Sequence, residues 1–82
     1  MSFKKRVYLT FPKDRVTDPV ICTMYDKFKV RFNIRSATVN DHMGVMALEL
    51  EGENETQVDK ALDFFRTQGL TAEPIEMDVI TG

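Results

Sequence analysis

Residues 30–52, VRFNIRSATVNDHMGVMALELEG, contain two runs of alternating apolar and polar residues on either side of a short polar loop. A period of two is typical of strands with one buried face. The loop ends in Gly44, which tolerates the positive φ angles of hairpin turns. The stretch therefore predicts an antiparallel hairpin. Its inward rows are Val30, Phe32 and Ile34 on the first strand and Met46, Leu48 and Leu50 on the second.

The first run changes phase after Ile34. Ala37 and Val39 fall out of step with it, which predicts a β-bulge near Arg35 or Ser36. The outward residues of the hairpin are Arg31, Asn33 and Arg35 on one strand and Val45, Ala47, Glu49 and Glu51 on the other.

Residues 4–29 predict a strand and then a helix. Alternation from Lys4 to Phe11 is interrupted by Pro12 and indicates a strand whose inward residues are Val7, Leu9 and Phe11 and whose outward residues are Arg6, Tyr8 and Thr10. Asp18 is a candidate N-cap, and Pro19 fits the first helical position, where no N–H is needed. The helix should end near Lys29. Its apolar stripe is Val20, Ile21, Met24, Tyr25 and Phe28.

Residues 54–75 predict a second helix and a last strand. Asn54 can cap the helix, and Gln57 occupies the capping-box position three residues later. Gly69 is expected to end the helix as its C′ residue. Residues 70–75 read as a strand that lies at an edge or an end, because Pro74 cannot donate a ladder hydrogen bond.

The order strand, helix, strand, strand, helix, strand predicts an α+β fold, the ferredoxin-like βαββαβ sandwich. Its four-stranded antiparallel sheet would carry both helices on one face and leave the other face open. The 82 residues suffice for one domain, over residues 1–82, with a core over about 4–76 and a C-terminal tail over 77–82. Domains of this size often gain stability by oligomerising, so we expect a homodimer.

Composition narrows the function classes. Cys22 is the only cysteine, so the chain alone builds no disulfide and no CxxC metal or cluster site, and we expect no metal, no cofactor and a cytoplasmic location. The net charge of −2 disfavours nucleic acid, and no apolar run is long enough to insert into a membrane. His42 is the only histidine and lies in the hairpin loop without a nearby nucleophile, so we predict no catalytic residue and no enzymatic activity.

The open sheet face is the predicted binding surface, because the helices cover the other face. It carries arginines and glutamates together, which match the carboxylate and the ammonium of a free amino acid. Opposite charges on a solvated sheet face are equally consistent with ordinary cross-strand pairs.

The chain resembles the NIL domain, an ACT-like regulatory domain found at the C-terminus of bacterial methionine-importer ATPases. The order and spacing of several segments carry the resemblance over nearly the whole chain. The family's Asn-Ile-Leu tripeptide corresponds here to Asn33-Ile34-Arg35, where a guanidinium replaces an aliphatic side chain. The other matching segments are Val7 to Pro12, Asp18 to Ile21, Phe32 to Ile34, Gly44, Leu48 to Gly52 and Gln68 to Leu70.

The resemblance implies a free-standing regulatory module that senses a small ligand, an amino acid with methionine as first candidate, between the two chains of a homodimer. The ligand-binding residues expected on this basis and on the open face are Asn33, Ile34, Arg35, Arg31 and Tyr8. The alternative is a protein-interaction adaptor of the same fold that docks on a transporter or redox partner without binding an amino acid. The chain lacks a phosphate-binding GxxxxGK[ST] loop, so it carries no ATPase machinery of its own.

Overall fold

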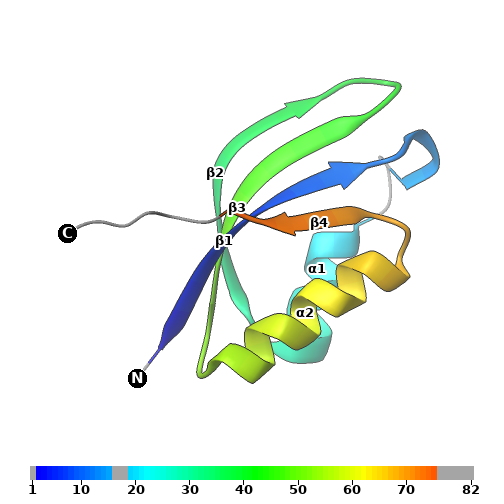
Figure 1. The fold of residues 1–82 in the computed structure, drawn as a ribbon. Helices are drawn as coiled ribbons and strands as arrows, with labels where there is room; N and C mark the ends of the chain where they lie inside the picture. The colour runs from blue at the N-terminus through cyan, green and yellow to red at the C-terminus, as the bar shows by residue number, and fades with distance from the viewer. Residues whose placement is uncertain (1, 16–18, 76–82) are drawn as a thin grey trace.

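The computed structural model describes residues 2–15 and 19–75, and it confirms the ferredoxin-like order of elements. The four strands form one antiparallel sheet in the order β2-β3-β1-β4, and both helices lie on the same side of it (Figure 1). The elements are β1 (Phe3–Phe11), a 3-10 turn η1 (Lys13–Arg15), α1 (Val20–Phe28), β2 (Arg31–Val39), β3 (Gly44–Gly52), α2 (Glu55–Thr67) and β4 (Thr71–Pro74). The predicted tail over 77–82 lies outside the described residues.

The core lies between the sheet and the helices. Alternate residues of the central strands β1 and β3 point into it, and Val7, Leu9 and Leu48 are completely buried. From the helices, Met24 and Phe65 are completely buried against this row. Burying such side chains stabilises the fold by about 1.5–3 kcal/mol each, so the core depends on both the central strands and the helices.

The predicted bulge is present in β2. Residues up to and including Ile34 pair with β3 in one register, and residues from Ser36 onward pair in a register shifted by one. Arg35 is therefore the extra residue. The alternation resumes with Ala37 and Val39 on the same face as Ile34, which explains the change of phase in the sequence.

Helix α1 begins one residue later than the sequence suggested. Pro19 is the N-cap and not the first helical residue, because its carbonyl oxygen already accepts the Thr23 N–H at 3.1 Å. The proposed cap Asp18 lies outside the described residues. The helix ends at Phe28, as expected, with Lys29 in the left-handed conformation at φ 57°.

Helix α2 confirms its predicted cap with one change of partner. The Asn54 side chain accepts the Gln57 N–H at 2.9 Å, but the Gln57 side chain accepts the N–H of Glu53, one residue before the expected cap N–H. The Gln57 amide also donates to the Phe28 carbonyl at 2.8 Å, which ties the start of α2 to the end of α1. Gly69 follows the helix with φ 89°, as its predicted role requires.

Strand β2 is much more exposed than the strands beside it. Phe32 and Ile34 lie opposite Leu50 and Leu48 on the helix side of the sheet, as predicted. Yet 37% of Phe32 and 49% of Ile34 remain exposed, whereas Leu48 and Leu50 are completely buried. The difference arises because β2 is an edge strand with β3 on one side only. A pattern that predicts facing direction therefore does not predict burial at the edge.

Candidate functional site

The five predicted binding residues lie on two faces of the sheet. Arg31 and Asn33 on β2 are opposite Glu51 and Glu49, so they lie on the open face. Tyr8 on β1 lies on this face too, with 49% of its surface exposed. Ile34 lies on the helix side.

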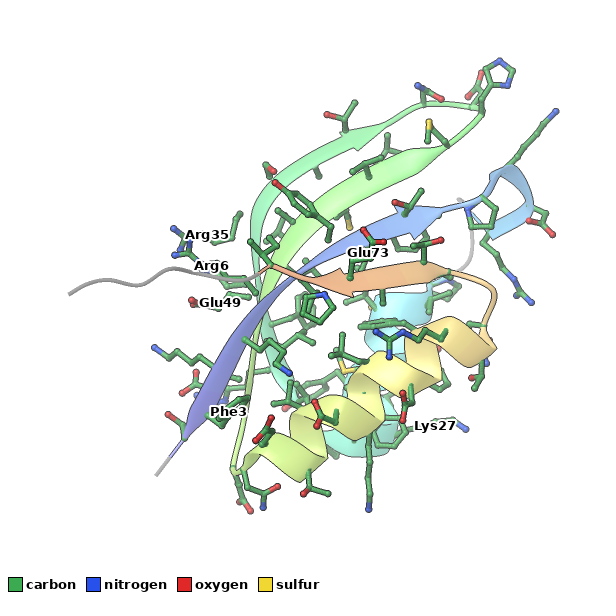
Figure 2. All side chains as sticks on the ribbon, in the orientation of Figure 1. Phe3, Arg6, Lys27, Arg35, Glu49 and Glu73 are labelled. Carbon is green, nitrogen blue, oxygen red and sulfur yellow. The ribbon has the colours of Figure 1, made fainter. Side chains whose placement is uncertain are left out.

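Arg35, the extra residue of the bulge, joins the open-face group. Figure 2 shows the side chains of Arg35, Arg6 and Glu49 projecting to the side of the sheet that faces away from both helices. The bulge therefore brings a guanidinium to the open face at the position where the register changes. The structure thus brings Arg31, Asn33 and Arg35 together on one strand and leaves Tyr8 two strands away on β1.

One ion pair links the central strands on the open face. Arg6 Nε lies 3.6 Å from Glu49 Oε2, and the two residues are direct cross-strand neighbours. The Nε atom is buried and has no hydrogen-bond partner, because 3.6 Å is too long for an N–H···O bond. The Arg6 side chain as a whole is nevertheless 38% exposed.

An apolar pocket lies on the helix side, where the start of α1 faces the hairpin end of β2 and β3. Its volume is about 160 Å³. Sequence reasoning missed it, because its residues come from four separate segments that only the fold brings together. Their apolar character was the one available signal. The lining residues are Phe11, Pro19, Val20, Ile21, Cys22, Val39, Gly44 and Met46.

Cys22 on α1 and His42 in the hairpin loop are both exposed. Cys22 lines the apolar pocket and is exposed. His42 is exposed in the hairpin loop, where its N–H and that of Met43 donate to the Asn40 side chain. These bonds form an Asx-type turn and explain the loop without assigning chemistry to the imidazole.

Within residues 2–15 and 19–75, the structure holds no group of three or more His, Cys, Asp and Glu side chains arranged to bind a metal ion. Neither described helix has the length and apolar character required to cross a membrane.

Comparison with known proteins places this fold in a family. The C-terminal domain of an ABC transporter ATP-binding protein from Enterococcus faecalis superimposes with a TM-score of 0.77 at 20% identity, over 90% of this chain and 86% of that one. The ACT domain of GTP pyrophosphokinase from Chlorobium tepidum gives a TM-score of 0.60 at 22% identity, over 93% and 89% of the two chains. No curated protein matches the sequence. The model of the NIL domain family matches residues 5–74, and the chain therefore belongs to the NIL domain family.

Proposed function

We propose that this domain is a regulatory module that binds a free amino acid, with methionine as the first candidate, and that acts as a homodimer joined through strand β2. The observation that carries the proposal is the apolar pocket beside an exposed edge strand, in a chain of the NIL domain family. The proposal assigns the domain no catalysis. It places the module in the cytoplasm, where it would report ligand level to a transporter or redox partner.

The pocket suits an apolar side chain. Cavities of about 150 Å³ with apolar walls bind molecules as large as benzene. A pocket of about 160 Å³ lined by Phe11, Val39 and Met46 therefore has room for a thioether side chain. Contacts between sulfur and an aromatic ring such as that of Phe11 are favourable, which makes methionine a better candidate than a branched aliphatic residue.

The polar groups for the amino-acid head lie at the other end of β2. Within one chain, Asn33 and Val39 are separated by most of the strand, so the same ligand cannot reach both. A two-fold antiparallel pairing of two β2 edges places the start of one strand beside the end of the other. The pocket of one copy would then lie next to Ile34 of its partner on the helix side, and Asn33 and Arg35 of that partner would approach the ligand head from the open face, at the shared edge. Arg31 would extend this polar side, and Tyr8 would reach only a ligand that spreads onto the open face.

Titration calorimetry of the chain with L-methionine tests the proposal, with L-serine as the control for the amino-acid head alone. We expect saturable binding of methionine near one ligand per chain and much weaker binding of serine. V39D should weaken methionine binding about tenfold or more, since it places a carboxylate in an apolar pocket. N33A should weaken it as well, and K60Q on the exposed surface of α2 should not.

Absence of any methionine signal, with the fold intact by circular dichroism, would refute the ligand-sensing proposal. It would favour the adaptor, for which the nine-residue exposed edge of β2 is the supporting observation. Such an edge can accept a strand from another protein as readily as from a second copy. A monomer by light scattering at micromolar concentration would argue against the homodimer.

A further inference from the structure

Charged side chains are concentrated at one end of the open face, where β1 and β2 begin and β3 ends. Two glutamates of β3 form its middle. Glu51 has a cation on both sides, whereas Glu49 has Arg6 on the β1 side and Asn33 on the β2 side. In one row Glu51 lies between Arg31 of β2 and Lys4 of β1. In the next row Glu49 pairs with Arg6 of β1, and Arg35 projects to the same face from the bulge in β2 (Figure 2).

Four cations thus surround two carboxylates in a chain whose net charge is −2. A further carboxylate, Glu73 of β4, belongs to the next row, opposite Tyr8. Among the residues that the structure describes, Arg31, Arg35 and Lys4 make no ion pair, so three of the four positive charges have no fixed partner. The row of Tyr8 also contains Ser36 and Ala47, and the row beyond it carries the hydroxyl and methyl groups of Thr38, Val45, Thr10 and Thr71.

The surface is hollowed on both sides of Glu49. One depression, of about 270 Å³, is lined by Arg31, Asn33 and the two glutamates together with Phe32. The other, of about 340 Å³, is lined by Lys4, Arg6 and Glu49 together with Lys5 and Ile75. The first depression therefore combines one cation with two carboxylates, the second combines three cations with one carboxylate, and Glu49 belongs to both.

We propose that this end of the open face is a second ligand site, for an acidic amino acid. The two carboxylates of such a molecule match the cations in the two depressions, where an arginine fork can bind a carboxylate through two hydrogen bonds. Its ammonium group matches Glu49, which is 24% exposed between them. Methionine satisfies only part of this pattern, because it has one carboxylate. The site is on the opposite face from the apolar pocket and needs neither the pocket nor methionine, although it shares Arg31 and Arg35 with the polar side proposed above.

The charge pattern predicts that one substitution changes the affinities for two related ligands in opposite directions, which attraction to net charge alone would not produce. The wild-type chain should bind L-glutamate more tightly than glutarate, which has both carboxylates but no ammonium. In E49Q the ammonium loses its partner and a repelling carboxylate disappears, so glutamate binding should weaken and glutarate binding should strengthen. Loss of one charged hydrogen bond corresponds to about a tenfold change in affinity, and we expect each shift to be of that order.

Titration calorimetry at constant ionic strength gives these affinities. R35L and K4Q should each weaken glutamate binding about tenfold, whereas K60Q removes the same charge from the surface of α2 and should leave it unchanged. Equal weakening by all three variants would show attraction to net charge alone and would overturn the proposal. So would glutarate binding as well as glutamate to the wild-type chain, or no binding of either ligand.

Two variants separate this site from the pocket. K4Q should weaken glutamate binding and leave methionine binding unchanged, since Lys4 is on the open face of β1. V39D should do the reverse, since Val39 lines the pocket. If the wild-type chain binds only one of the two ligands, the missing one shows which of the two proposals has failed.

Discussion

The two edges of the sheet differ in how they are protected. Strand β4 has four residues and strand β2 has nine, and each has a neighbour on one side only. Unpaired edge strands invite pairing with other chains, so proteins usually shorten, cover or interrupt them. The two edges of this domain therefore differ in how open they are to association with another chain.

The β4 edge is closed in three ways. It is short, and Pro74 removes one donor from it. Because Ile75 N–H donates to Arg6 O, the alternation of an antiparallel ladder turns the N–H and C=O of Ala72 outward. The outward carbonyl of Ala72 is bound by Arg66 Nη2 from α2 at 2.8 Å. The β4 edge therefore offers few free backbone hydrogen-bonding groups to another strand.

The β2 edge lacks most of these protections. All nine of its residues are exposed and none is proline. Its one protective feature is the bulge at Arg35, which leaves a regular four-residue stretch on each side. Ile34 and Val39 are 49% and 55% exposed, so this edge also presents apolar side chains. The domain thus closes one edge and leaves the other available for the proposed homodimer.

The largest expected effect contrasts the sheet centre with the open edge. Ile34 and Leu48 are direct cross-strand neighbours on the same face, but only Leu48 is buried. L48A should lower the free energy of unfolding by about 2–5 kcal/mol. I34A should lower it by about 1 kcal/mol, as half of the side chain is already exposed. Urea denaturation of a monomeric sample measures both. Similar losses would mean that the β2 edge is as well packed as the centre.

A positive charge at the open β2 edge should weaken the proposed dimer. I34K places a cation from each chain at the shared edge, and we expect the dissociation constant of the dimer to rise at least about tenfold. T71K adds the same charge to β4 and should leave it unchanged. Light scattering over a concentration series gives both values. Equal effects of the two variants would show that β2 is not the dimer edge.

Removal of the Arg66 side chain should expose the closed β4 edge. R66A removes the bond to the Ala72 carbonyl and should lower the free energy of unfolding by about 1–2 kcal/mol. It should also produce species larger than a dimer in light scattering, since β4 would then offer an unpaired carbonyl. D63N is the matched control, because it removes only the exposed Arg66–Asp63 ion pair at 3.3 Å and should cost under about 0.5 kcal/mol.

The smallest expected effect concerns the bulge. Deletion of Arg35 should join the two halves of β2 into one register and tighten the dimer, by less than about tenfold. R35L removes the charge but keeps the extra residue, so it separates the two contributions. If R35L alone tightens the dimer, then the guanidinium, and not the extra residue, limits association. Weaker association after the deletion would show that the dimer uses the bulged geometry.

The sequence by itself determined the elements and their order. Alternation with period two and apolar stripes with helical spacing reflect local geometry, so they predicted four strands, two helices and even the bulge near Arg35. Local capping chemistry did the same for Asn54 and Gly69. The match of these segments to a known family added the resemblance to the NIL domain.

Only the tertiary structure decided which strands lie at the edges, and the candidate sites follow from that order. Alternation gives the direction of Ile34 but not its exposure, which depends on the absence of a neighbour beyond β2. The apolar pocket joins residues from β1, α1, β2 and β3, and the charge rows join residues from three strands. Such sets depend on strand register, a non-local property that no single segment of the sequence contains.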